Sequence, residues 1–181
     1  MELLRTDRVI LRAWRADEAD RLLDILSRPE VKRWIDDDQD DPVLMRTREE
    51  ARERIAAYAA GHEPGSPRGF WAVEERATGI VAGTVLITTA GSDPPPDETE
   101  VEIGWHLHPD SWGHGYASEA ARAVLAHGFA HGLPEILAVT HLDNHPSQGV
   151  CRKIGMTDQG VVEKWYDGPS QLYRITVAEH G

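Results

Sequence analysis

A turn with two glycines constrains this chain most, because it stands between a strand pattern and a helix pattern. The segment reads Pro109-Asp110-Ser111-Trp112-Gly113-His114-Gly115-Tyr116-Ala117-Ser118-Glu119-Ala120. An alternating stretch at Thr99–Leu107 leads into the turn, and a helical pattern from Gly115 to His131 leaves it. A short apolar stretch, Ile136–His141, follows the helix. A strand–helix–strand unit of this length implies one parallel crossover in the sheet.

The rest of the chain predicts a mixed α+β fold with a largely antiparallel sheet. Further strands are expected at Val9–Trp14, Phe70–Glu75, Gly79–Thr88, Val161–Tyr166 and Leu172–Ala178. Further helices are expected at Asp17–Ser27, from Thr47 to the break at Gly61, and at His145–Ile154. The acidic run 36–42 and the proline-rich stretch 91–97 are expected to be loops. No linker or repeat divides the 181 residues, so one domain over 1–181 is expected.

The composition excludes several classes of partner. A net charge of −12 repels nucleic acid and attracts cationic partners. No apolar stretch is long enough to span a bilayer, and the first residues lack a signal-peptide pattern, so no membrane partner is expected. The single cysteine, Cys151, rules out an internal disulfide framework. A cytoplasmic location is expected, and a homodimer is left open.

The glycine turn is a candidate anion site. The first amides of a helix have no intrahelical acceptor and lie at the positive end of the helix dipole. Gly113 and Gly115 would let the backbone approach a phosphate without a Cβ in the way. A Walker loop is excluded because Gly-Lys-Ser/Thr is absent, and a dinucleotide fingerprint fits poorly because His141 stands where an acidic residue is needed. A plain tight turn remains the alternative.

Four ordered motifs surround this turn. They are Glu102-Ile103-Gly104, Trp112-Gly113-His114-Gly115-Tyr116-Ala117-Ser118-Glu119-Ala120, Asn144-His145-Pro146-Ser147 and Lys153-Ile154-Gly155-Met156. Together they resemble the GNAT acetyltransferases, in particular the branch that includes the N-terminal acetyltransferases of ribosomal proteins. The resemblance implies a central sheet with helices on both faces and an acetyl-CoA-binding core at about 99–160.

The resemblance also implies an activity, which is acetyl transfer from acetyl-CoA to a primary amine. A protein N-terminal α-amine is the favoured acceptor. A small-molecule amine (polyamine, aminoglycoside-like compound or amino acid) and a non-catalytic acyl-CoA sensor are the alternatives. Acceptor specificity is expected in the loops 28–46 and 89–98, with Trp34 and Trp105 as candidate lining residues. The run Asp36–Asp41 is a candidate for the acceptor mouth, with a solvated loop as the alternative.

The coenzyme contacts follow from the same resemblance. The pyrophosphate would rest on the amides from His114 to Ser118, and the pantetheine arm would run beside the strand that ends at His106-Leu107-His108. Asn144 would hold the pantetheine, and Ser147 would lie near the sulfur. The full set of implied coenzyme-binding residues is His106, Leu107, His108, Trp112, Gly113, His114, Gly115, Tyr116, Ala117, Ser118, Asn144 and Ser147. Cys151 stands where the wider superfamily often has a tyrosine acid, which shifts that role to Ser147 or solvent.

An amine that attacks a thioester must lose a proton, so a base is needed. Glu100, Glu102 and His106 share one strand face by the period of two. Glu102 is the favoured base because it begins the Glu-Ile-Gly motif, with Glu100 and His106 as substitutes and two solvated glutamates as the plain alternative. A backbone amide near Leu107 would stabilise the developing oxyanion.

No metal site is expected. His127 and His131 have the spacing of a helical ligand pair, but no third ligand accompanies them, and a solvated helix edge is the better interpretation. His106 and His108 point to opposite faces of a strand, which argues against chelation.

Overall fold

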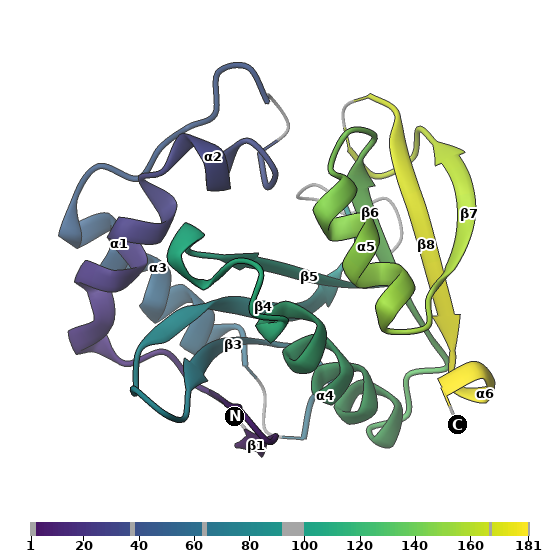
Figure 1. The fold of residues 1–181 in the computed structure, drawn as a ribbon, viewed down its shortest axis with the longest axis horizontal. Helices are drawn as coiled ribbons and strands as arrows, with labels where there is room; N and C mark the ends of the chain where they lie inside the picture. The colour runs from purple at the N-terminus through teal and green to yellow at the C-terminus, as the bar shows by residue number, and fades with distance from the viewer. Residues whose placement is uncertain (1–2, 37–38, 63–64, 92–99, 167, 181) are drawn as a thin grey trace.

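The computed structural model describes residues 3–36, 39–62, 65–91, 100–166 and 168–180 (Figure 1). The strands are β1 (Leu4–Arg5), β2 (Val9–Arg12), β3 (Gly69–Glu75), β4 (Val81–Thr89), β5 (Val101–Leu107), β6 (Glu135–His141), β7 (Thr157–Val162) and β8 (Ser170–Thr176). The helices are α1 (Ala19–Leu26), α2 (Pro29–Lys32), α3 (Arg48–Ala60), α4 (Tyr116–Ala130), α5 (His145–Lys153) and α6 (Val177–His180). The predicted loop at 91–97 lies outside the described residues from 92 onward.

The eight strands form one sheet in the order β1-β2-β3-β4-β5-β6-β8-β7. Every neighbouring pair is antiparallel except β5 and β6, which are parallel and joined through α4. The predicted α+β class and its single parallel crossover are therefore confirmed. The parallel pair meets at one position only, Glu102 opposite Leu137. Figure 1 shows the two strands spreading apart beyond it.

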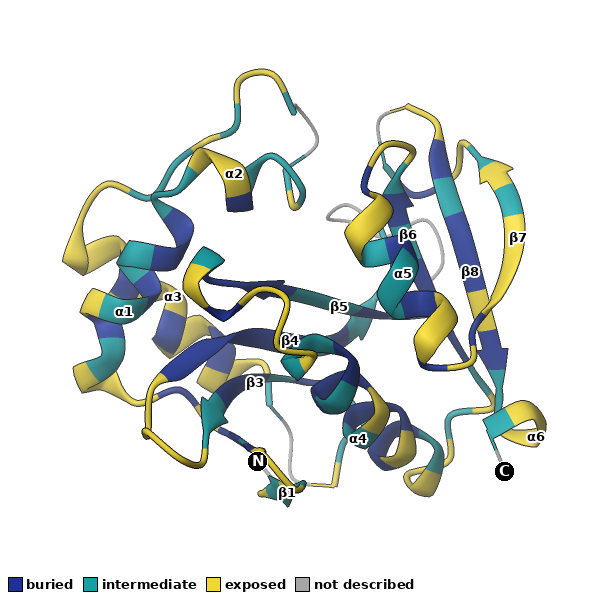
Figure 2. Ribbon diagram, viewed as in Figure 1, coloured by how far each residue is buried: buried dark blue, intermediate teal, exposed yellow. Residues whose placement is uncertain are grey.

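One face of the sheet packs on α4 and α5. Alternate residues of the central strands point into this core, and Trp71 on β3 is fully buried there. On α4 the buried residues recur at helical spacing, as predicted, and include Ala120, Ala121, Val124 and Leu125. Figure 2 shows the same division, with buried residues along the central strands and on the inner side of α4.

The opposite face carries α1 and α3. Leu22 and Ile25 of α1 are fully buried against α3 residues such as Ile55. Helix α3 begins at its predicted cap, because the Thr47 hydroxyl accepts a hydrogen bond from the Glu50 amide at 3.2 Å. The Glu50 carboxylate accepts from the Arg46 amide at 2.9 Å, one residue earlier than a capping box requires. Helices therefore cover both faces, as the resemblance implied.

The predicted strand at Val161–Tyr166 is wrong in its bounds. The strand β7 spans Thr157–Val162, and residues 163–166 leave the sheet. Trp165 packs against Leu137 and Leu172 on one face of the sheet. Its side chain is therefore buried although its backbone is not part of a strand. The polar start of β7 is exposed, which explains why no apolar period marked it.

Two smaller predictions also need correction. β8 ends at Thr176 and not at Ala178, because α6 begins at Val177 and the Glu179 carboxylate accepts from the Thr176 amide at 2.8 Å. His127 does not lie on a solvated helix edge, since it is buried edge-on against Trp71 with ring centroids 5.3 Å apart. His131 is exposed. In the described ranges no helix has both the length and the apolar character needed to cross a bilayer.

Candidate active site

A cleft of about 1170 Å³ opens where β5 and β6 separate. One side is formed by β5, the glycine turn and the first residues of α4, and the other by β6 and the first turn of α5. The cleft continues across the sheet face to α3 and to the segment between α2 and α3. It therefore joins two compartments, one beside the glycine turn and one beneath α3.

The backbone of β5 offers hydrogen-bonding groups to this cleft. The Glu100 carbonyl accepts from the Ala90 amide and the His108 amide donates to the Ala82 carbonyl, both at 2.8 Å. In an antiparallel pair the bonded residues alternate, so even-numbered residues of β5 face β4. Odd-numbered residues accordingly face β6, and the Leu107 carbonyl there already accepts from the Trp112 indole at 2.8 Å. Beyond the Glu102–Leu137 pair, the backbone groups of Trp105 and the Leu107 amide face the gap. An extended amide-containing ligand could pair with them as a strand would.

The glycine turn has the geometry of an anion site. Gly113 and Gly115 have φ of +77° and +79°, a left-handed conformation that glycine adopts at little cost. The first backbone bond of α4 runs from the Glu119 amide to the Gly115 carbonyl at 3.1 Å, and no side chain caps the helix. The amides of Tyr116, Ala117 and Ser118 therefore have no acceptor within the helix, and a phosphate fits this position.

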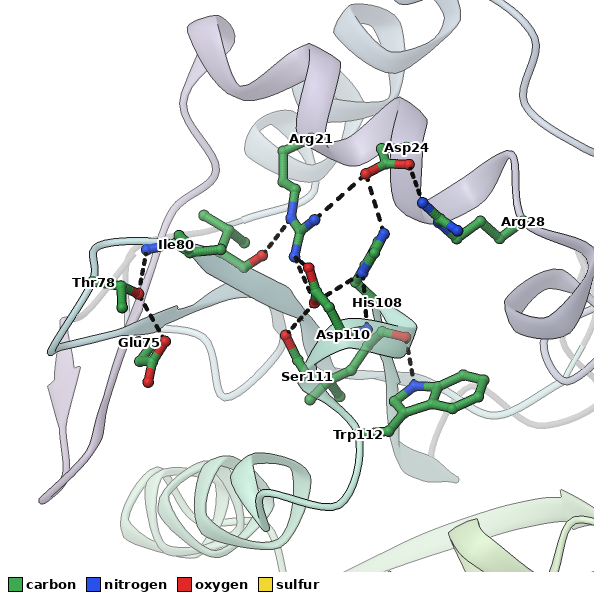
Figure 3. A network of polar contacts seen from close by, with 12 residues as sticks. Arg21, Asp24, Arg28, Glu75, Thr78, Ile80, His108, Asp110, Ser111 and Trp112 are labelled. Atoms are coloured by element: carbon green, nitrogen blue, oxygen red, sulfur yellow. Dashed lines mark hydrogen bonds and ion pairs between the residues drawn. The ribbon is translucent and has the colours of Figure 1, made fainter.

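A network of polar contacts around the buried His108 ring holds the chain between β5 and the glycine turn (Figure 3). The His108 ring accepts from the Asp110 amide at 3.1 Å and lies 3.1 Å from a carboxylate oxygen of Asp24 on α1. Burial would raise the pKa of Asp110, but hydrogen bonds from Arg21 and Ser111 outweigh it and lower the pKa to about 2. The network thus ties the segment that precedes the glycine turn to helix α1.

The structure separates the twelve implied coenzyme residues into two groups. Most of them line the cleft: His106, Leu107, Trp112, Gly113, Gly115, Tyr116, Ala117, Ser118, Asn144 and Ser147. The side chains of His108 and His114 do not. His108 belongs to the polar network described above, and the His114 ring stacks on Tyr116 at 5.5 Å between centroids.

Asn144 and Ser147 meet at the start of α5. The Asn144 side-chain oxygen accepts from the Ser147 amide at 3.2 Å and so caps the helix. Its amide nitrogen is the group with which Asn144 could donate to a ligand. Cys151 is buried behind this turn, and burial raises the pKa of its thiol to about 12. The thiol does not line the cleft, so it is not placed to exchange a proton there.

Glu102 on β5 lines the cleft. Burial raises the pKa of its carboxyl to about 7, although a hydrogen bond from the Tyr166 hydroxyl, at 2.5 Å, acts to lower the pKa. Glu100 differs, because it accepts from Lys164 at 2.6 Å and from the Trp165 indole at 2.8 Å and does not line the cleft. Of the two glutamates only Glu102 lines the cleft, and the pKa of its own carboxyl is near neutrality.

His106 lies further along the same strand face. Burial lowers the pKa of its ring to about 4, and the nearby charges of Lys32 and Arg54 lower it further, so the ring is neutral at physiological pH. Its Nε2 has no hydrogen-bond partner among the described residues. A buried polar atom of this kind at a cleft wall is available to a water or a ligand.

The second compartment is largely apolar and aromatic. Tyr58 of α3 stacks on Phe70 of β3 with centroids 4.5 Å apart, and Trp34, Val43 and Met45 also line the space. The segment after α2 reaches across to β6, where the His141 ring lies 3.2 Å from the Asp36 carbonyl. Together these elements form a walled space beside Glu102, large enough for a second substrate.

Asp36 lines the cleft, but its carboxylate is already paired. It accepts from Lys32 at 2.5 Å and from the Val43 amide at 2.7 Å. Asp40 and Asp41 also have interaction partners, and Asp37 and Asp38 lie outside the described residues. The three described aspartates of the run are therefore not free carboxylates.

Comparison with known protein families decides what kind of site this is. A model of the acetyltransferase (GNAT) domain matches residues 8–157. The chain belongs to the GNAT acetyltransferase family. It is accordingly an acetyl-CoA-dependent N-acetyltransferase, and its fold is one that binds acetyl-CoA. Two observations of the structure fit this co-substrate: the uncapped amides at the glycine turn, and the β5 backbone groups that face the gap.

Known proteins support the same assignment. The uncharacterized N-acetyltransferase YoaA of Bacillus subtilis is 31% identical over 165 residues, which cover 90% of this chain and 87% of YoaA. A GNAT acetyltransferase from Bacillus anthracis has a TM-score of 0.75 at 23% identity, covering 97% of this chain and 98% of that one. RimL, a ribosomal L7/L12 α-N-protein acetyltransferase solved with coenzyme A, has a TM-score of 0.78 at 17% identity, covering 99% and 100%. At these identities the two structures establish the shared fold alone.

Sequence reasoning missed Tyr166 as a functional candidate. The residue was assigned to a strand, whereas the chain after β7 folds over the sheet and brings its hydroxyl to Glu102, 64 residues away. It also missed Lys32 and Arg54, whose charges act on His106 from α2 and α3. No local pattern marks these residues, because their roles arise from contacts between distant segments.

Proposed function

We propose that this acetyltransferase moves an acetyl group from acetyl-CoA to a protein N-terminal α-amine, by direct attack within a ternary complex. The observation that carries the proposal is the position of Glu102 on the cleft wall, where its carboxyl accepts from the Tyr166 hydroxyl and burial raises its pKa to about 7. A free α-amine has a pKa near ~8, so proton transfer between the two groups is close to balanced. A lysine side chain, with a pKa near ~10.4, is matched less well. The fold shared with RimL supports the same class of acceptor.

The coenzyme is assigned to the compartment beside the glycine turn. The amides of Gly115, Tyr116, Ala117 and Ser118 would hold the pyrophosphate, and the β5 backbone groups that face the gap would pair with the pantetheine amides. Asn144 would donate its side-chain amide to the same arm. The thioester of acetyl-CoA supplies an activated acetyl group.

The acceptor is assigned to the compartment beneath α3. Glu102 would take a proton from the incoming ammonium or amine, directly or through one water, while Tyr166 holds the carboxylate in place. A β5 amide that faces the gap, at Trp105 or Leu107, would donate to the carbonyl oxygen as negative charge develops on it. Ser147 would lie near the departing sulfur. A thiol pKa near ~8.5 makes the thiolate an acceptable leaving group even without an acid.

The proposed acceptor is tested by following coenzyme A release with two panels. One contains short peptides with free N-termini and the same peptides with blocked N-termini; the other contains polyamines, aminoglycosides and free amino acids. Turnover is expected with free N-termini and not with blocked peptides that carry lysine. Turnover confined to the small-molecule panel would show that the acceptor is a small amine and not a protein N-terminus. Coenzyme binding without turnover on any amine would favour a sensor.

Replacing Tyr166 by phenylalanine tests the control of the base. The Tyr166 hydrogen bond lowers the pKa of Glu102, so its loss raises that pKa and leaves less carboxylate at neutral pH. We expect the acid limb of the kcat/KM profile to move to higher pH, with activity about 3–10-fold lower near pH 7 and nearly unchanged at high pH. Tyr173→Phe, whose hydroxyl contacts Arg152 away from the cleft, is the control. An unmoved acid limb in Tyr166→Phe would show that Glu102 is not the titrating group.

We further propose that the chain works as a single domain in the cytoplasm. One continuous sheet with helices on both faces supports the first point. A free, buried cysteine is compatible with a reducing compartment. Size-exclusion chromatography with light scattering would establish whether a homodimer forms.

A further inference from the structure

The segment between β1 and β2 binds the side chain of Glu119, which lies in the first turn of helix α4. The Thr6 hydroxyl donates to one carboxylate oxygen at 2.5 Å, and the Arg8 amide donates to the same oxygen at 2.8 Å. The Arg8 guanidinium meets the other oxygen through Nε at 2.7 Å and Nη2 at 2.6 Å. Both oxygens of Glu119 are thus engaged by a segment more than 100 residues away in the chain. This arrangement holds the arginine in one position beside the glycine turn.

The remaining arm of Arg8 binds the glycine turn itself. Its Nη1 donates to the His114 carbonyl at 2.8 Å. Because a peptide unit is planar and trans, the His114 carbonyl and the Gly115 amide point in opposite directions. Arg8 lies outside the cleft wall, whereas Gly115 lines it. A carbonyl held toward Arg8 therefore turns the Gly115 amide toward the cleft.

This peptide needs such a restraint. It joins His114 to Gly115, which has φ +79°, and Gly113, at φ +77°, stands just before His114; glycines reach alternative backbone conformations easily. A flipped peptide would present a carbonyl oxygen to the coenzyme phosphate instead of an N–H donor. The other amides of the site, at 116–118, are already oriented by the helix. The peptide between His114 and Gly115 is thus the part of the site whose direction the helix does not determine.

We propose that Arg8, held by Glu119, is a positioning residue for coenzyme binding, which orients the Gly115 amide toward the pyrophosphate. The proposal rests on the coenzyme site assigned above. Arg8 acts through geometry and not through its charge, because the carboxylate of Glu119 already neutralises the guanidinium at 2.6 Å. A point charge at the same place would not replace it, since one ammonium group cannot bridge the carboxylate and the carbonyl as a planar fork does.

The test measures binding in the absence of any acceptor. The affinities of Arg8→Met, Arg8→Lys and the wild type for coenzyme A are compared by calorimetry, and those for pantetheine, which lacks the diphosphate, by competition. Both variants are expected to weaken coenzyme A binding by about tenfold, the worth of one hydrogen bond to a charged group, and to leave pantetheine binding unchanged. Arg15→Met, which removes a 60% exposed arginine that contacts Glu74 and does not line the cleft, is the matched control and should bind both like the wild type.

Three results would overturn the proposal. The first is wild-type affinity for coenzyme A in folded Arg8→Met. The second is wild-type affinity in Arg8→Lys, which would mean that charge alone is needed. The third is an equal loss for pantetheine, which would mean that the whole cleft is disturbed. If Arg8→Met does not fold, Glu119→Gln replaces it in the test, because it weakens the ion pair that holds the Arg8 guanidinium in place. A wild type that binds coenzyme A but acetylates no amine would refute the proposed function and leave the Arg8 result standing.

Discussion

Glu102→Gln is expected to lower kcat by about 10²–10⁴-fold, the usual contribution of a general base. Glutamine keeps the size and shape of the side chain and can still accept the Tyr166 hydrogen bond, but it cannot take a proton at neutral pH. Coenzyme A binding should persist, because the pyrophosphate site is formed by other residues. The residual rate should rise with pH, since a higher pH supplies neutral amine without a base. Steady-state kinetics from pH 6 to 9, with calorimetry of coenzyme A, measure all three effects.

Two variants on the same strand face serve as controls. Glu100→Gln removes a carboxylate that is bound by Lys164 and Trp165 outside the cleft, and it should retain most of the activity. His106→Ala removes a neutral ring and should not abolish the pH dependence. Wild-type turnover in Glu102→Gln, together with collapse in either control, would move the base to that residue. Activity in all three would mean that solvent takes the proton.

Stability provides an independent check on the Glu102 environment. Its folded pKa of about 7 lies above the ordinary value of 4.5, so the native state holds the proton more tightly than the unfolded chain. The free energy of unfolding therefore falls as pH rises from about 4.5 toward 7. The glutamine variant avoids this loss, and its Tm above pH 7 should equal or exceed that of the wild type. A lower Tm in the variant at that pH would contradict the burial assigned to the carboxyl.

Gly115→Ala is expected to raise the KM for acetyl-CoA by about tenfold or more, with little change in the KM for the amine. Gly115 has φ +79°, a conformation that a side chain disfavours by about 1–2 kcal/mol, so alanine shifts the turn that carries the amides. The loss of one well-directed hydrogen bond to a phosphate is worth about 1.5–3 kcal/mol. Initial-rate kinetics with each substrate varied in turn separate the two constants.

Gly132→Ala is the matched control for backbone strain. Gly132 follows the other end of α4 at φ +90°, and an added Cβ there would meet no atom within 4 Å. Both variants should lose a similar amount of stability, yet only Gly115→Ala should lose affinity for the coenzyme. An equal rise in KM for both variants would attribute the effect to α4 as a whole. An unchanged KM in Gly115→Ala would remove the basis for placing the pyrophosphate at this turn.

The fold could be predicted from the sequence wherever local pattern and burial agree. The helix from Gly115 to His131 carries its apolar residues at helical spacing, and the structure has α4 at Tyr116–Ala130. The single parallel crossover followed from strand–helix–strand order alone. The end of the chain was predicted less well, because Trp165 and Tyr166 have strand-forming side chains that instead pack over the sheet face.

Some features of the candidate site could likewise be predicted from the sequence, and others could not. By itself the sequence determined the family, the glycine turn and the presence of Glu102, Asn144 and Ser147, because each depends on residue type within a short segment. Only the tertiary structure decided that Glu102 and not Glu100 faces the cleft, that Tyr166 meets it, and that Arg8 holds the His114 carbonyl. These contacts join residues 64 and 106 positions apart. Their geometry depends on how the sheet spreads and how loops pack over it, which no local pattern of side chains encodes.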